Sequence, residues 1–272
     1  MLDEKKSFHV SQIHGIPVNI SNPEQALSEV DYLIQIRQHH YVCFFEGNLF
    51  FRALFEDDVK QVISSASLIY PDGIAVAKEL KWKLKKNVSR ISGPSFLLRA
   101  CEYGIERNWK HFFLGGDTSV PEKLAQNLQA KYSGLKVVGT YSPPFRDLSV
   151  DEEIELKKMI EDSQADLLWV GLGGPKQEFW MKKHLNMIDV PVMLGIGAAF
   201  DFHSGNRPWA PYIIRILGME WLYRMICGGK KTFYRNVKCV SHLCFILLFD
   251  WLRQLFRRPE KTFFRFDNGI KD

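Results

Sequence analysis

Short apolar runs alternate with longer stretches of helical spacing between residues 13 and 205. Each apolar run has four to six residues, which is the length of a buried strand. Strands that alternate with helices are typical of βαβ units, so the pattern predicts a Rossmann-like α/β fold. We expect a mainly parallel sheet with helices on both faces. Strands are predicted at 41–45, 67–70, 110–114, 135–140, 166–171 and 190–194, and helices at 48–65, after 71–73, and at 120–132, 151–163 and 175–185.

The start of the chain carries its own local signals. Residues 13–20, which include Gly15 and Pro17, favour a short β-hairpin or edge element. Ser21-Asn22-Pro23-Glu24 has the Ser-x-x-Glu spacing of a capping box, which predicts a helix that runs to about Arg37.

The segment after about residue 205 has a different character, because it is helical in pattern, basic and rich in Trp, Phe and Leu. Residues 207–258 hold ten lysines and arginines against two acids, whereas the whole chain has a net charge of +5. An anionic partner is therefore expected at this end. We interpret residues 1–205 as a catalytic α/β core that binds a nucleotide sugar. Residues 206–272 are expected to be a helical appendage that closes the active site and associates with a membrane.

Residues 240–258 have the pattern of a basic amphipathic helix. Their uninterrupted apolar run, 243–249, is far shorter than the ~20 residues that span a bilayer. Such a helix lies on an anionic membrane surface with its arginines toward the headgroups. The alternative is a helix packed on the core or in a homo-oligomer interface.

Composition narrows the classes of function. Hydrophobic residues make up 46% and charged residues 25% of the chain, as in a folded globular protein. The charged start, 1–6, precedes no apolar run of signal-peptide length, so a cytoplasmic protein with reduced cysteines is expected. His39-His40 lacks companions at metal-ligand spacing, and we expect no metal and no cofactor.

Four glycine-bearing turns follow predicted strands. Ligands in open α/β sheets bind beyond the carboxyl ends of the strands, so the four turns should approach one crevice. In residues 171–178, glycines allow close backbone approach, and a cation, an amide and a carboxylate follow at a helix start that attracts phosphate. An ordinary strand-to-helix turn is the alternative. The turns are Glu46-Gly47-Asn48, Pro71-Asp72-Gly73, Gly115-Gly116-Asp117 and residues 171–178.

Two carboxylates and one guanidinium are candidates for the chemistry. Asp72 follows an apolar strand and could take a proton from an attacking hydroxyl, although an Asp before Gly more often caps a turn. Glu46 is a second strand-end carboxylate, or a residue that favours the start of a helix. Arg90 could bind phosphate or pair with one of these acids.

Six motifs occur in one order along the chain: Pro71-Asp72-Gly73-Ile74, Arg90-Ile91-Ser92-Gly93, Phe113-Leu114-Gly115-Gly116, residues 171–180, residues 195–202, and residues 207–211 through 218–224. The series resembles the WecG/TagA/CpsF bacterial glycosyltransferases, glycosyltransferase family 26, over residues 13–235. The resemblance implies transfer of a sugar from a UDP-sugar to a polyprenyl-diphosphate-linked saccharide, with inversion and without a metal. It also implies a peripheral location on the inner face of the cytoplasmic membrane.

Carried over by position, the family's proposed base corresponds to Asp72, its active-site arginine to Arg90 and its motif glutamine to Gln177. Glu46 and Asn48 stand where many members have a Thr-x-Asn turn, so Glu46 is a rival base. The residues interpreted as binding the nucleotide sugar are Gly115, Gly116, Gly171, Gly173, Lys176, Gln177, Glu178, Gly197, Arg207, Arg215, Arg224, Lys231 and Arg235.

Three other interpretations are weaker. An NAD(P)-dependent oxidoreductase would be expected to carry Gly-x-Gly-x-x-Gly in its first βα turn, which this chain lacks. A nucleotide-sensing scaffold for polysaccharide assembly would need the crevice but no base. Nucleic-acid binding is not expected, because the basic tail matches no nucleic-acid module and pairs its charges with an apolar face.

Overall fold

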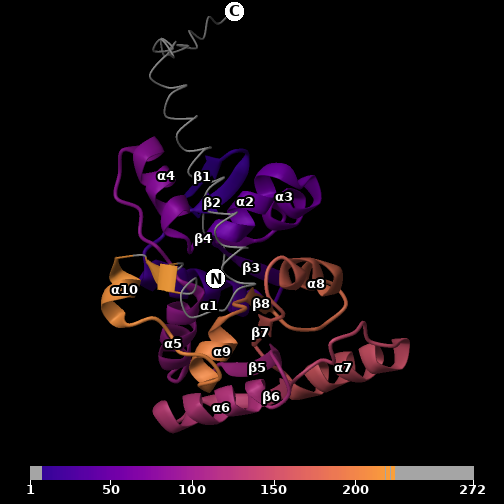
Figure 1. The fold of residues 1–272 in the computed structure, drawn as a ribbon. Helices are drawn as coiled ribbons and strands as arrows, with labels where there is room; N and C mark the ends of the chain where they lie inside the picture. Colours follow the sequence, from indigo (N-terminus) through magenta and orange to yellow (C-terminus); the bar gives the residue numbers. More distant parts are fainter. Residues whose placement is uncertain (1–7, 218, 221, 224–272) are drawn as a thin grey trace, which may run out of the picture.

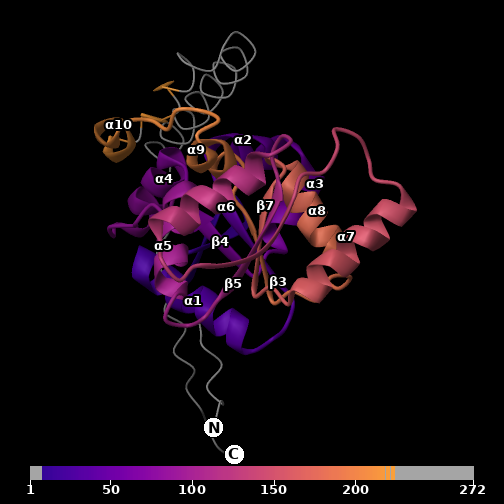
Figure 2. The ribbon, with the colours of Figure 1, turned by 90° about the horizontal axis from the view of Figure 1, so that it is seen from below.

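The computed structural model describes residues 8–217, 219–220 and 222–223. Its centre is a parallel six-stranded sheet in the order β4-β3-β8-β7-β5-β6, with helices on both faces (Figures 1 and 2). The predicted fold class is therefore confirmed. The strands are β3 (His40–Phe45), β4 (Leu68–Pro71), β5 (Lys110–Gly115), β6 (Lys136–Tyr141), β7 (Leu167–Gly171) and β8 (Val192–Gly195).

Two hydrophobic clusters lie on opposite faces of the sheet. Successive side chains of a strand point to opposite faces, and Cys43 and Phe45 belong to one cluster while Val42 and Phe44 belong to the other. The first cluster includes buried side chains of α2 (Gly47–Phe55), α3 (Asp57–Ser64), α4 (Ile74–Leu84), α7 (Val150–Ser163) and α8 (Lys176–His184). The second includes those of α1 (Pro23–Gln35), α5 (Gly93–Gly104), α6 (Val120–Lys131) and α9 (Ala199–Ser204).

The predicted hairpin at 13–20 is present as β1 (Val10–Ile13) and β2 (Ile16–Asn19), which pair antiparallel. The predicted start of α1 is wrong by one residue. Asn22 is the N-cap and exchanges hydrogen bonds with Gln25, whereas Ser21 donates its hydroxyl to buried Glu29. A residue before proline is driven to extended backbone, so Pro23 makes Asn22 adopt the N-cap conformation.

The single helix predicted at 48–65 is also wrong, because it is two helices. Glu56 is extended, with φ −123° and ψ 104°, and it separates α2 from α3. Asp57 and Asp58 then occupy the first turn of α3, where acids favour the positive end of a helix. The sequence pattern does not predict α5 and α9. The start of α5, Gly93-Pro94, contains two residues that also punctuate loops.

After α9 the described chain continues into α10 (Tyr212–Ile216). The boundary expected at residue 205 remains a prediction, and so does the role of 206–272. Arg224, Lys231, Arg235 and the helix expected at 240–258 lie outside the described residues. In the part of the chain that is described, no helix is both long and apolar enough to cross a bilayer.

Candidate active site

The parallel sheet brings the ends of β3, β4, β5, β7 and β8 to one edge, and all four glycine-bearing turns begin there. The turns thus share one edge of the sheet, as expected, while the crevice between them stays a prediction. Two of the turns touch, since a Cβ on Gly73 would lie 2.8 Å from the backbone nitrogen of Gly47. This contact requires glycine after Asp72 and holds the Asp72 turn against the start of α2.

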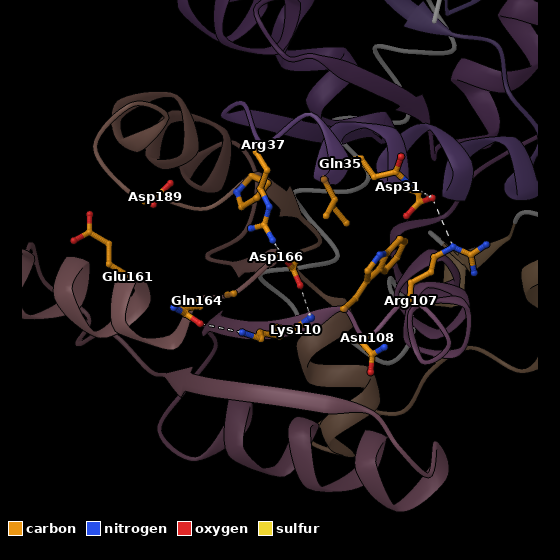
Figure 3. Close-up of a pocket in the computed structure, with 14 residues that line it drawn as sticks. Asp31, Gln35, Arg37, Arg107, Asn108, Lys110, Glu161, Gln164, Asp166 and Asp189 are labelled. Atoms are coloured by element: carbon orange, nitrogen blue, oxygen red, sulfur yellow. Dashed lines mark hydrogen bonds and ion pairs between the residues drawn. The ribbon is translucent and has the colours of Figure 1, made fainter. Parts of the chain in front are cut away.

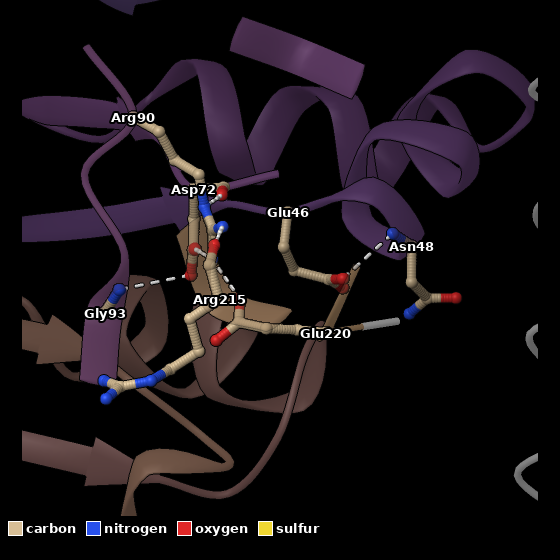
Figure 4. A network of polar contacts seen from close by, with 7 residues as sticks. All are labelled: Glu46, Asn48, Asp72, Arg90, Gly93, Arg215 and Glu220. Atoms are coloured by element: carbon tan, nitrogen blue, oxygen red, sulfur yellow. Dashed lines mark hydrogen bonds and ion pairs between the residues drawn. The ribbon is translucent and has the colours of Figure 1, made fainter. Parts of the chain in front are cut away.

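Asp72 lies directly after β4 and its side chain is 16% exposed. Its Oδ2 accepts a hydrogen bond from the backbone N–H of Gly93 at 3.2 Å, and its Oδ1 lies 3.6 Å from Nη2 of Arg90. Arg90 also donates from Nε to the backbone carbonyl of Asp72 (Figure 4). Asp72 and Arg90 therefore form one unit at the edge of the sheet. Arg90 thus pairs with one of the two candidate acids, and its contact with phosphate stays a prediction.

Two residues from the segment after α9 complete this unit. Arg90 donates from Nη1 to the carbonyl of Arg215 at 3.2 Å and from Nη2 to the carboxylate of Glu220. The Glu220 side chain is 10% exposed. Sequence reasoning missed Glu220 as a site residue, although it lies within the last family motif. Its pairing joins positions 130 residues apart, which no local pattern reveals.

Glu46 lies beside this unit but is used differently (Figure 4). It is the N-cap of α2, and its two carboxylate oxygens accept the backbone N–H groups of Asn48 and Leu49, each at 3.1 Å. The structure thus places Glu46 in the helix-starting role that was the alternative to a base. The Asn48 backbone serves the same cap.

Gln177 and Glu178 form a buried polar pair at the start of α8. Their side chains are joined by a 2.8 Å hydrogen bond from Nε2 of Gln177 to Oε1 of Glu178. Gln177 is 4% exposed and Glu178 is fully buried. Oε1 of Gln177 and Oε2 of Glu178 have no hydrogen-bond partner. Burial raises the pKa of Glu178 to about 7, and the negative charge of Glu46 adds to this, while the hydrogen bond from Gln177 opposes it.

The glycines of this edge separate into two kinds. A Cβ on Gly115 would lie 2.5 Å from the carbonyl carbon of Gly171, and one on Gly171 would lie 2.6 Å from the Phe200 ring. Packing alone therefore requires glycine at both positions. Gly173 has a φ of +78° and open space around its Cβ position, so a ligand can approach there. Lys176, the first residue of α8, is exposed beside it.

The other predicted site residues lie as follows. Gly116 receives the Ser142 hydroxyl on its carbonyl, and Gly197 packs against the Gln177 side chain. Arg207 forms an ion pair with Asp201 at 3.2 Å. The guanidinium of Arg215 lies 3.7 Å from the centre of the Trp209 ring and points away from Arg90 (Figure 4). Neither cation is aimed at the Asp72 turn in this structure.

A separate groove of about 880 Å³ lies at the amino edge of the sheet (Figure 3). Its cations are paired with neighbours: Arg37 with Asp166 at 3.2 Å, and Lys110 with Gln164 at 3.2 Å. It lies at the opposite end of the strands from Asp72. No group of three or more His, Cys, Asp or Glu residues suited to a metal ion occurs among the residues that the structure describes.

The fold is that of open α/β-sheet proteins, a class that binds its ligands beyond the carboxyl ends of the strands. Within that class the chain belongs to the glycosyl transferase WecG/TagA/CpsF family, whose profile matches residues 11–261. The resemblance found in the sequence is thereby confirmed.

Curated relatives carry one name, N-acetylglucosaminyldiphosphoundecaprenol N-acetyl-beta-D-mannosaminyltransferase. The protein of that name from Staphylococcus aureus (strain MRSA252) is 32% identical over 172 residues, which are 63% of this chain and 65% of the relative. The one from Bacillus spizizenii (strain ATCC 23059 / NRRL B-14472 / W23) is 30% identical over 181 residues, 66% of this chain and 68% of the relative. The chain thus matches about two thirds of the length of these relatives.

Proposed function

We propose that the protein is a glycosyltransferase that moves a sugar from a UDP-sugar to a saccharide linked to polyprenyl diphosphate. The reaction would serve the synthesis of an exopolysaccharide, capsule or wall polymer. Membership of the glycosyltransferase family supports the reaction class. The relatives' name makes an N-acetylmannosaminyl donor and an N-acetylglucosaminyldiphosphoundecaprenol acceptor the first pair to test.

The observation that carries this proposal is the position of Asp72. Its carboxylate stands beside Arg90 at the carboxyl edge of the sheet, the edge at which the Gly173 turn also begins. In the proposed reaction an acceptor hydroxyl oxygen bonds to the anomeric carbon of the donor sugar, and its proton passes to Asp72. The bond from that carbon to the diphosphate oxygen breaks, and UDP leaves with the electron pair. A single displacement of this kind inverts the anomeric configuration.

The start of α8 is the proposed place for the donor diphosphate. Backbone N–H groups and the positive end of a helix attract phosphate, and the exposed Lys176 adds a full charge there. Preorganised cations and N–H groups gain in strength as charge develops on departing UDP, and in this proposal they replace a divalent metal. Arg207 and Arg215 would have to turn from their present partners to join them.

The test combines a donor panel with one substitution. The protein is incubated with several UDP-sugars and short-chain lipid-diphosphate saccharides, and UDP release and product mass are measured. Asp72→Asn should lower kcat by about 10²–10⁴, the usual contribution of acid–base catalysis, with little change in UDP affinity. No transfer with any pair would refute the function, and normal turnover in Asp72→Asn would refute the assigned base.

We also propose that the basic C-terminal part holds the enzyme on an anionic membrane, where its lipid-linked acceptor lies. The sequence of 240–258 supports this, since its charges lie along an otherwise apolar helix pattern. A chain ending at residue 239 should lose sedimentation with anionic liposomes yet still act on soluble acceptor analogues. Undiminished sedimentation at physiological salt would refute the membrane role.

A further inference from the structure

Glu220 is a buried carboxylate that the proposed reaction leaves without a role. It follows α10 and is 8% exposed as a whole residue. Its carboxylate accepts a charge-assisted hydrogen bond from Nη2 of Arg90, and the two side chains form an ion pair. Carboxylates are seldom buried to this extent unless they are paired, so the contact with Arg90 accounts for the burial.

Each of the three guanidinium nitrogens of Arg90 donates a hydrogen bond. Nε donates to the carbonyl of Asp72, Nη1 donates to the carbonyl of Arg215, and Nη2 donates to Glu220. The edge formed by Nη1 and Nη2 is one of the two edges through which a guanidinium binds an anion with two parallel hydrogen bonds. Residues from the segment after α9 occupy that edge (Figure 4). Arg90 thus connects the Asp72 turn to the segment after α9.

The distance between Arg90 and Asp72 affects how strong a base Asp72 can be. The closest charged atoms of the two side chains are 3.6 Å apart, longer than a direct charge-assisted hydrogen bond. Nη2 of Arg90, the nitrogen that faces the carboxylate of Asp72, donates instead to Glu220. A guanidinium that closed fully on Asp72 would stabilise its ionised form and make it a weaker base.

We propose that Glu220 is a positioning residue for the transfer reaction: it holds Arg90 at a distance from Asp72 that keeps Asp72 a competent base. This inference rests on the proposed function. It also assigns Arg90 to the support of the Asp72 turn rather than to the donor diphosphate. Within the described residues, the charged groups near Asp72 include Arg90 from the loop before α5, Glu220 after α10, and Glu46 at the start of α2.

Glu220→Gln is the test, because it removes the charge and keeps a hydrogen-bond acceptor of the same shape. We expect kcat to fall by about 10–100-fold, the range in which small misplacements of a catalytic group act. The acid limb of the kcat–pH profile should move to lower pH, since Arg90 is then free to pair with Asp72. The donor KM should change by less than about threefold, because the lost interaction belongs to the transition state.

Two further variants test whether Glu220 acts through Arg90. Glu24→Gln is the matched control, since it cuts a Glu–Arg pair of 2.8 Å with Arg99 that is exposed and belongs to no site. It should leave kcat unchanged. In an Arg90→Gln background, Glu220→Gln should add no further loss, because the residue acts through Arg90. An equal loss in that background would overturn the proposal, and so would wild-type kcat in Glu220→Gln. A lower donor KM with unchanged kcat would also overturn it, since Glu220 would then be a competitor of the diphosphate.

A structural readout keeps the inference distinguishable from the function on which it rests. Hydrogen exchange needs no substrate, and Glu220→Gln should raise deuterium uptake in peptides covering 86–92 and 212–217 but not 110–115. If the wild-type protein transfers no sugar, the proposed function is refuted. Hydrogen exchange then still tests the contact between Glu220 and Arg90. If uptake is unchanged in both segments, the positioning role fails even in an active enzyme.

Discussion

Glu178→Gln should stabilise the protein at alkaline pH and leave its stability at acid pH nearly unchanged. Glu178 is fully buried, and burial raises its pKa from 4.5 to about 7. The folded state therefore holds a proton that the unfolded state releases at lower pH. Between about pH 4.5 and 7 the folded state binds more protons than the unfolded state, so the free energy of unfolding falls as pH rises. The stability that protonated Glu178 contributes is fully present below pH 4.5 and is lost through pH 7.

The size of the effect follows from the two pKa values. Each pKa unit corresponds to about 1.4 kcal/mol, so ionised Glu178 costs the fold on the order of 3 kcal/mol above pH 8. Glutamine has the same shape without the charge, and its Oε1 can still accept the hydrogen bond from Gln177. Its amide N–H groups would take the place of Oε2, which has no hydrogen-bond partner, and leaving them unpaired costs about 1 kcal/mol. We expect a net gain of about 1–3 kcal/mol at pH 8 and none at pH 5.

Urea unfolding at both pH values, followed by tryptophan fluorescence, measures this difference. Comparing the variant with wild type at one pH removes the contributions that the two proteins share. Glu29→Gln is the control: Glu29 is also buried, but Ser21 and Tyr70 each donate a hydroxyl to it at 2.7 Å. That variant should lose stability at both pH values. A gain for Glu178→Gln that is equal at pH 5 and pH 8, or a greater loss at pH 8, would refute the reasoning.

Two further substitutions test the edge of the sheet. Glu46→Gln should weaken α2 by about 1 kcal/mol through its cap and leave most of the turnover, whereas a loss as large as that of Asp72→Asn would make Glu46 the base. Gly115→Ala should destabilise the protein by at least about 2 kcal/mol, because φ is +130° and the new Cβ would meet the Gly171 backbone. Gly205→Ala, with φ +80° and no atom nearby, should cost only about 1 kcal/mol, and equal melting temperatures for the two would contradict the packing argument.

The strands were predictable from the sequence because both faces of the sheet are covered. A strand buried on both sides needs continuous apolar residues, and β3 and β7 show this directly, with five and four consecutive buried positions. Helix boundaries were less predictable, because they depend on single residues. Glu56 breaks a stretch of uniform helical spacing, and nothing in that spacing marks the break. The start of α5 at Gly93-Pro94 was missed because proline at the first turn of a helix and proline in a loop have the same local sequence.

The candidate site also has features that the sequence predicts and features that it does not. Residues that lie on the turns after strands, such as Asp72 and Gln177, could be placed at one edge because parallel topology alone brings those turns together. What each side chain does there depends on partners from distant parts of the chain. Arg90 contacts Glu220, which is 130 residues away in the sequence, and the raised pKa of Glu178 arises first from burial, with a contribution from the charge of Glu46.

Glu46 and Glu178 are both carboxylic acids at this edge of the sheet, but they differ in burial and in hydrogen bonding. Both oxygens of Glu46 accept hydrogen bonds from backbone N–H groups at 3.1 Å at the start of α2. Glu178 is fully buried, and the hydrogen bond from Gln177 does not offset the penalty that burial places on its charge. A fold selected for stability alone would place an apolar or amide side chain at 178. Retention of a carboxyl group that costs stability at neutral pH is the pattern expected of a functional site, and it places the Gln177–Glu178 pair beside Asp72 among the residues to test first.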